Sequence, residues 1–249
     1  MPSAASPPSS FIGDLLSIMD AKHHPAWPVL MGPGTARAQL ALHYRQEYVV
    51  YVRDFPVLLA RVHSRCPVPA VRRDLAENLY EEETGRLSGT GPHPDLFLDM
   101  MEALGFARQQ FDDVDLLPAA RVYRDWLDEA TLERRWEVGA AVVTLFVEGS
   151  VADRHAVEGR PRPASPLDRD PLVLHHGLQP SDLVLKQAHS RVEAGHRAAA
   201  WRIVEEQVTS PAARMAVQEA MARSLRLWLA YRDAVSLACG IATAPAGRA

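Results

Sequence analysis

Apolar residues recur every three to four positions along most of the chain, which is the spacing of one face of an α-helix. The alternation with a period of two that is typical of strands is hard to find. We therefore predict a short first helix and about seven main helices. The short helix covers residues 10–20, and the main helices cover 35–64, 70–86, 93–104, 119–129, 132–158, 182–207 and 211–237.

Prolines and small polar residues mark the ends of these predicted helices. Pro56 lies inside the first long helix and predicts a kink there. Ser181 is expected to cap the helix that follows it. Ser210 precedes Pro211, so the last helix is expected to begin with a proline in its first position.

The composition indicates one all-α globular domain. The chain has 249 residues, 47% of them hydrophobic, and neither a repeat nor an interdomain linker divides it. We expect this domain over residues 10–240, between a disordered tail at 1–9 and a flexible tail at 241–249. The net charge of −4 and the scattered arginines argue against nucleic-acid binding. No long apolar run predicts a membrane span and no signal peptide is recognisable. The two cysteines, Cys66 and Cys239, are far apart, which is typical of a reducing cytoplasm.

The segment from His189 to His196 carries two histidines and one glutamate, Glu193, at spacings of four and three residues. On a helix these spacings bring the three side chains onto one narrow stripe. Leu185 and Ile203 lie beside the same arc, so we expect the stripe to face inward. It fits a metal site or a proton-handling site, and the alternative is a solvated polar face.

Two further groups of polar residues stand next to apolar positions. Glu148 follows the apolar run 139–147, and burying its carboxylate is costly unless a metal ion, an arginine or a proton compensates the charge. Glu82 shares a helix face with leucines and is expected to look inward, and His93 opens the next helix. The alternative interpretation of the acidic run that contains Glu82 is a solvated helix end.

Together these groups supply three carboxylates and three imidazoles from four helical segments. The six residues are Glu82, His93, Glu148, His189, Glu193 and His196. Mixed nitrogen and oxygen ligands suit iron or manganese, and no thiolate favours structural zinc. Helix bundles build dimetal sites from such residues on facing helices. The Glu-x-x-His pairs of ferritin-like proteins are missing, so a different bundle is expected.

The same residues resemble the motifs of a known family. The stretch 77–105, with Glu-Asn-Leu-Tyr-Glu-Glu-Glu at its start, resembles the central motif of haem-oxygenase-like proteins of the TenA and PqqC type. The spacing His189-x3-Glu193-x2-His196 resembles the C-terminal motif of the diiron oxidases in that group. The resemblance extends from about residue 36 to about residue 208. It implies a haem-oxygenase-like helical bundle whose six ligands hold two Fe(II) ions, or manganese, with O2 as co-substrate.

Two features depart from the family pattern. The loop before His93 is longer than expected, which leaves the choice among Glu81, Glu82 and Glu83 open. Glu193 stands where the family often has an aspartate, and its longer arm can still reach a metal.

Other positions bear on the reaction. Members of the family that form p-aminobenzoate carry a lysine where this chain has Glu158, which argues against that self-sacrificing reaction. Tyr48 and Tyr51 lie on the predicted second helix, and we predict that they line the pocket as catalytic residues. The alternative is that both are ordinary core or surface tyrosines.

The resemblance implies a cytoplasmic non-haem diiron oxidase or oxygenase. Its substrate would be a small amino-acid-like molecule or a fatty acid, in specialised metabolism, and a homodimer is expected. A second hypothesis is a metal-free TenA-like hydrolase or PqqC-like oxidase. A TenA-like hydrolase needs a nucleophilic cysteine, and Cys66 lies at a helix end that does little to activate a thiolate. A third hypothesis is a non-enzymatic helical protein that binds a partner.

Overall fold

The computed structural model describes residues 10–160 and 166–241, and the tails predicted at the two ends lie almost entirely outside this part. The described residues form helices and no strand, so the predicted all-α single domain is confirmed. They contain twelve α-helices, because two of the predicted helices are each divided in two and two short helices lie outside the predicted ones. The α-helices are α1 (Ser10–Asp20), α2 (Trp27–Leu30), α3 (Arg37–Glu47), α4 (Phe55–Arg65), α5 (Pro69–Thr84), α6 (His93–Ala103), α7 (Pro118–Leu132), α8 (Trp136–Ala140), α9 (Asp153–Val157), α10 (Pro171–His176), α11 (Val184–Gln207) and α12 (Pro211–Ala238).

Five short segments have other helical geometries. The π-helical segments are η1 (Tyr48–Val52) and η3 (Ala141–Val147), and the 3-10 segments are η2 (Arg108–Phe111), η4 (Leu167–Arg169) and η5 (Pro180–Asp182). The kink predicted at Pro56 is wrong. The chain turns before it, after η1, and Pro56 lies in the first turn of α4, where a missing N–H costs nothing.

The boundaries of the later helices differ in the same way. The predicted helix 132–158 is divided, since η3 ends next to Glu148 and α9 begins five residues later. The cap predicted at Ser181 is wrong, because α11 begins after Leu183, which caps through no side chain. The start of α12 is as predicted, since the Ser210 hydroxyl accepts a hydrogen bond from the N–H of Ala213.

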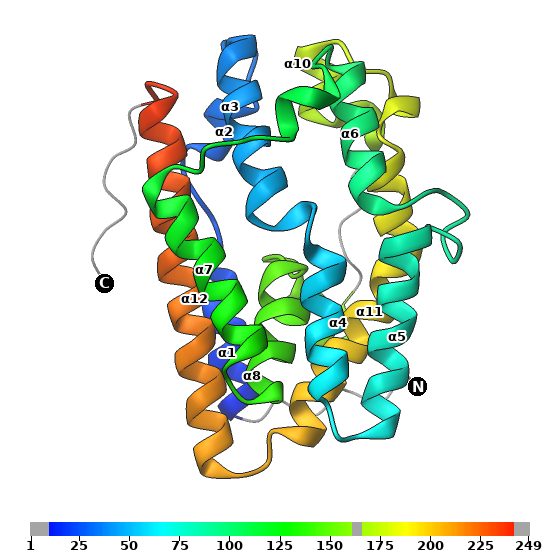
Figure 1. Ribbon diagram of the computed structural model, residues 1–249, viewed down its shortest axis with the longest axis vertical. Helices are drawn as coiled ribbons and strands as arrows, with labels where there is room; N and C mark the ends of the chain where they lie inside the picture. The colour runs from blue at the N-terminus through cyan, green and yellow to red at the C-terminus, as the bar shows by residue number, and fades with distance from the viewer. Residues whose placement is uncertain (1–9, 161–165, 242–249) are drawn as a thin grey trace.

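The helices form an upright bundle around η3. In Figure 1, α7 and α12 run side by side along one edge, and α5 and α11 run along the other. The η3 segment packs against α4, α7, α11 and α12, and its residues from Ala141 to Phe146 are buried. The end of this central element therefore brings Glu148 between the two halves of the bundle. Among the described residues, no helix has both the length and the apolar character needed to cross a membrane.

Candidate metal centre

The first two candidate ligands are brought together by the turn between α5 and α6. Gly85 ends α5 in the left-handed conformation, with φ of 61°, and a Cβ there would lie 2.2 Å from the carbonyl oxygen of Gly91. Only glycine allows this close approach, and the loop then returns the chain so that α6 begins at His93. As a result, Nδ1 of His93 lies 2.9 Å from Oε1 of Glu82.

Glu81 holds the other side of the same imidazole. Its carboxylate is fully buried and accepts hydrogen bonds from the backbone N–H groups of Leu87, at 2.7 Å, and Ser88, at 3.2 Å. Burial raises the pKa of Glu81, but hydrogen bonds from Ser88, Leu87 and His93 outweigh it and leave the pKa below its usual range. The ionised carboxylate therefore accepts the Nε2–H of His93, at 3.2 Å.

This arrangement turns Nδ1 of His93 toward Glu82. The atom is buried and has no hydrogen-bond partner, although Oε1 of Glu82 is only 2.9 Å away. Burial lowers the pKa of His93, but Glu82 and Glu81 together raise it above its usual range. Two electron-rich atoms so close together need a cation beside them, either a proton or a metal ion. A histidine held by a carboxylate on its far nitrogen is the usual form of a metal-ligating histidine.

The long helix α11 adds two histidines to the site. The rings of His93 and His189 lie edge to face, with centroids 4.9 Å apart. Ligand atoms of Glu82, His93 and His189 all lie within 4.8 Å of one another. About two turns further along α11, burial lowers the pKa of His196, which keeps its imidazole neutral and able to bind a metal. Glu193 lies between the two histidines on α11, but its side chain is outside the described part of the structure.

Glu148 enters the site from the end of η3. Its Oε1 accepts a hydrogen bond of 2.7 Å from Nδ2 of Asn78 on α5. Glu148 lines a small cavity of about 70 Å³ together with Glu82, His189 and His196. Four of the six predicted ligands thus line one cavity, and His93 contacts two of them, Glu82 and His189. His189 itself is exposed, so the expectation that its stripe faces inward is wrong at this residue. Glu83, the third glutamate of the acidic run, is exposed.

Two cations support this end of η3, the buried Arg197 and the partly buried Lys22. The Arg197 guanidinium donates to the carbonyl oxygen of Thr144 and forms an ion pair with Asp153. The Lys22 ammonium donates to the carbonyl oxygens of Phe146, at 2.5 Å, and Gly149, at 2.6 Å. Carbonyl groups at a helix end lack partners within the helix, so these cations satisfy them.

Sequence reasoning missed both cations, and it also missed Glu81 and Asn78 as supporting residues. Their partners are carbonyl oxygens, loop N–H groups and a side chain far away in the sequence. The apolar run before Glu148 did signal that a cation would be needed nearby.

The two predicted catalytic tyrosines lie elsewhere in the bundle. Tyr48 stacks on Phe97, with ring centroids 5.4 Å apart. The Tyr51 hydroxyl bonds to Glu47 and accepts from Nη2 of Arg232 at 3.0 Å. Neither tyrosine is among the described residues that line the cavity at Glu148, so their catalytic role stays a prediction.

Comparisons with known structures agree with the fold. A TenA homologue from Pseudomonas syringae superposes with a TM-score of 0.68, at 13% identity, over 92% of this chain and 93% of that one. A CADD-like protein of unknown function from Nostoc punctiforme gives a TM-score of 0.64, at 17% identity, over 91% of this chain and 97% of that one. At these identities the similarity shows the fold alone.

Curated relatives are also distant. The 4-aminobenzoate synthase of Chlamydia muridarum is 28% identical over 114 residues, which are 45% of this chain and 47% of that protein. The Chlamydia trachomatis protein of the same name is 27% identical over 155 residues, 60% of this chain and 63% of that one. The chain thus matches about half to just under two thirds of their length.

The sequence profile of one family matches most of the bundle. Residues 42–229 match the family described as iron-containing redox enzymes. This range includes all six predicted ligands, both helices that flank the loop before His93, and the whole of η3. The chain therefore belongs to the family of iron-containing redox enzymes.

Proposed function

We propose that the protein is an oxidoreductase that binds two Fe(II) ions and uses O2 to oxidise a small organic substrate. The observation that carries the proposal is the group formed by Glu82, His93 and His189, whose ligand atoms all lie within 4.8 Å of one another. A metal ion bound by these atoms would balance the charge of the Glu82 carboxylate. The family to which the chain belongs, and the distant 4-aminobenzoate synthases, support iron and redox chemistry.

We assign the ligands by the groups they form. Glu82, His93 and His189 would hold one ion, since their ligand atoms lie within 4.8 Å of one another. Glu148 and His196, which line the same cavity, and Glu193 would complete the set for the second. Three carboxylates and three imidazoles are a ligand set that suits iron, and manganese is the other metal that it fits. When bound, the iron supplies the electrons that reduce O2.

The remaining residues of the site orient these ligands. Glu81 fixes the tautomer of His93 by accepting its Nε2–H. Asn78 holds one oxygen of Glu148, and Arg197 lies 4.0 Å from the other. These contacts hold the ligand atoms in place, which is the part of metal catalysis that a protein contributes.

A TenA-like hydrolase is the alternative function that keeps this fold. It requires a reactive thiolate, and burial raises the pKa of both Cys66 and Cys239 above the usual range of a thiol. Both sulfurs contact backbone carbonyl oxygens, Cys66 that of Val68 and Cys239 that of Gln39. These surroundings favour the thiol form, which is a poor nucleophile.

The proposal is tested by replacing neighbouring glutamates of α5. Under anaerobic conditions the wild-type chain should bind about two Fe(II) ions, as dimetal bundles do. Glu82→Gln removes a charged ligand and should bind about one ion or fewer, while Glu83→Gln changes an exposed residue and should bind as the wild type does. Bound iron is measured by colorimetric assay after gel filtration, and helicity by circular dichroism.

Admission of O2 should then give a transient visible absorbance in wild type and Glu83→Gln only. A folded wild-type chain that retains no iron would refute the proposal. Equal iron binding by the two variants would refute the assignment of Glu82.

A further inference from the structure

The loop between α5 and α6 folds around the buried carboxylate of Glu81. The backbone N–H groups of Leu87 and Ser88 donate to Oε2 of Glu81, whose other oxygen accepts from Nε2 of His93. The Ser88 hydroxyl donates to the carbonyl oxygen of Gly85, at 3.1 Å, which closes the loop on itself. The position of Ser88 therefore sets the position of Glu81 and, through it, the orientation of the His93 ring.

One side chain of α11 reaches this loop. Nη1 of Arg191 donates to the carbonyl oxygen of Ser88 at 2.7 Å, and Ser88 is buried while Arg191 is exposed. Arg191 lies two residues after His189, whose ring contacts the ring of His93. The hydrogen bond thus joins the helix that carries one proposed ligand to the loop that orients another.

The charge of Arg191 would not be chosen for its effect on a metal ion. A guanidinium so near a proposed ligand repels a cation, so electrostatics alone would favour a neutral or acidic residue at this position. The hydrogen bond to Ser88 supplies a reason for the arginine. A guanidinium on a long side chain can reach a carbonyl oxygen of the neighbouring loop, and its charge strengthens the bond.

We propose that Arg191 is a positioning residue for the metal centre. It acts through Ser88 and Glu81 on His93, which it holds with Nδ1 at 2.9 Å from Oε1 of Glu82. We call this series of hydrogen bonds, from Arg191 to His93, the relay. The presence of a metal at its end rests on the proposed function, whereas the relay itself does not.

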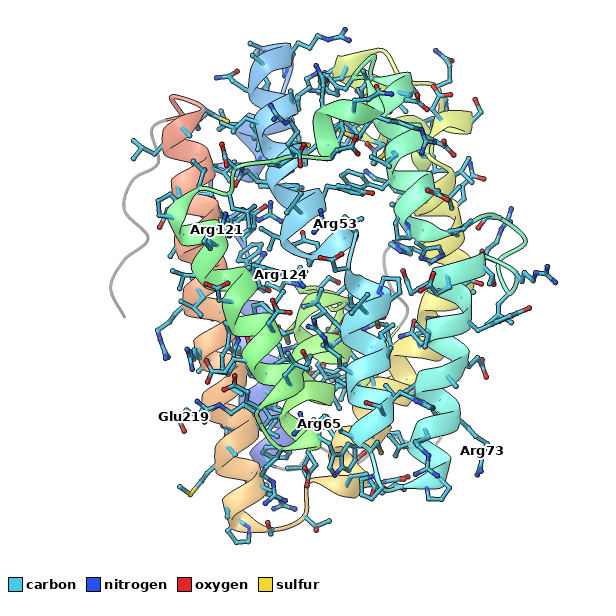
Figure 2. The ribbon with its side chains drawn as sticks, in the orientation of Figure 1. Arg53, Arg65, Arg73, Arg121, Arg124 and Glu219 are labelled. Carbon is cyan, nitrogen blue, oxygen red and sulfur yellow. The ribbon has the colours of Figure 1, made fainter. Side chains whose placement is uncertain are left out.

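Two other arginines supply matched controls. Arg202 is also exposed on α11 and forms an ion pair of 2.8 Å with Asp74, which lies on α5 seven residues before Glu81. Replacing it by methionine loosens α11 from α5 without touching the loop. Arg73 is exposed near the start of α5, where its side chain points into solvent (Figure 2). Its replacement by methionine removes only a charge. An effect through Glu81 should appear in Arg191→Met alone.

The first test uses the metal-free chain. Nitrogen-15 NMR follows the exchange with water of the Nε2–H proton of His93, which is slow while that proton is buried and bonded to Glu81. Local opening of the loop in Arg191→Met should make this exchange about tenfold faster. In Arg202→Met and Arg73→Met it should stay within about twofold of wild type. Wild-type exchange in Arg191→Met would overturn the proposal.

The second test measures the affinity for Co(II), with the metal ion alone as the probe. Because Arg191→Met removes a positive charge, electrostatics alone would tighten binding. Loss of positioning should instead weaken it about tenfold, the low end for residues that support metal ligands. Arg191→Lys keeps the charge and a shorter donor, so it should lie between wild type and Arg191→Met in both tests. Binding by Arg191→Met as tight as wild type, or tighter, would overturn the proposal.

A double-mutant cycle tests the route through Glu81. Glu81→Gln should itself weaken Co(II) binding, and adding Arg191→Met should then change the affinity by less than about twofold, because the relay is already broken. A further tenfold loss would overturn the route. Circular dichroism checks the helicity of each variant, and Arg191→Lys decides the matter if Arg191→Met does not fold.

The two proposals fail separately, because proton exchange is measured without metal. A wild-type chain that binds no metal refutes the proposed redox function, and faster exchange in Arg191→Met still supports the relay. Wild-type exchange in that variant refutes the relay, even in a chain that binds metal.

Discussion

Gly149 shows how one residue without a side chain can support a proposed metal ligand, Glu148. A Cβ at this position would lie 2.0 Å from the carbonyl oxygen of Leu145 and 2.6 Å from Nη2 of Arg197. Because the backbone is bare, the Arg197 guanidinium can approach the end of η3 and hold it beside Asp153. Gly149 therefore helps to fix the position of the Glu148 carboxylate.

We expect Gly149→Ala to destabilise the fold and to lower iron binding together. Forcing a methyl group into this contact should cost about 1–3 kcal/mol of unfolding free energy, as overpacking usually does. Gly13, inside α1, is the control, because a Cβ there meets nothing within 4 Å. Gly13→Ala should stabilise by about 0.5–1 kcal/mol. Urea unfolding and iron counting measure both effects, and a Gly149→Ala variant with wild-type values would contradict the argument.

The candidate site could be predicted from the sequence only in part. His189 and His196 are fixed by spacing along one helix, which is local information. The choice between Glu81 and Glu82 depends on the path of the loop at Gly85, which sets the carboxylate that each imidazole nitrogen of His93 meets. No periodicity encodes that path, so the adjacent glutamates could not be separated.

The element on which the site depends most is η3, whose carbonyl groups are held by Lys22 and Arg197. Lys22 is partly buried, and its pKa falls from 10.5 to about 7. Burial is the main cause, and the nearby charges of Arg197 and Arg232 add to it. The lysine can thus lose its charge near neutral pH while its remaining N–H groups still point at the end of η3.

This depressed pKa predicts a specific dependence of stability on pH. Between pH 7 and about 10, the unfolded chain binds a proton on Lys22 that the folded chain does not, so the folded state gains stability as the pH rises. The unfolding free energy of wild type minus that of Lys22→Met should increase by about 1.4 kcal/mol per pH unit in this window. Urea titrations at three pH values measure this difference in unfolding free energy. A difference that does not change with pH would mean that the pKa of Lys22 is not shifted.

Most elements of the fold could be predicted, but their interruptions could not. The range of α1 matches the periodicity, and α12 begins at the proline after its serine cap. The long predicted helices break near Arg53 and Gly149, where π-helical turns precede the break. These breaks are stabilised by tertiary partners such as Lys22. Local helix propensity does not depend on such distant partners, so it could not predict the breaks.

At the scale of the whole molecule, the proposed ligands come from α5, α6, the end of η3 and α11. A metal bound by all of them would tie together elements that are far apart in the sequence. Because such a metal binds the folded chain only, it must stabilise the fold by mass action. The proposed metal centre would in this sense be a part of the tertiary structure.

Thermal unfolding should therefore respond to metal. At a free concentration about a hundred times the dissociation constant, Fe(II) should add about 3 kcal/mol. For a chain of this size that corresponds to a rise of about 6–12 °C in Tm, and a chelator should reverse it. Glu82→Gln should show little of this rise and Glu83→Gln all of it. Identical melting curves with and without metal would contradict a shared centre.

The contact between Lys22 and the carbonyl groups around Glu148 also affects the choice of fragment for experiments on the metal centre. The family profile begins at residue 42, so the lysine lies upstream of the region that defines the family. A fragment cut to residues 42–229 would keep every proposed ligand and lose the ammonium group that holds the carbonyl groups on either side of Glu148.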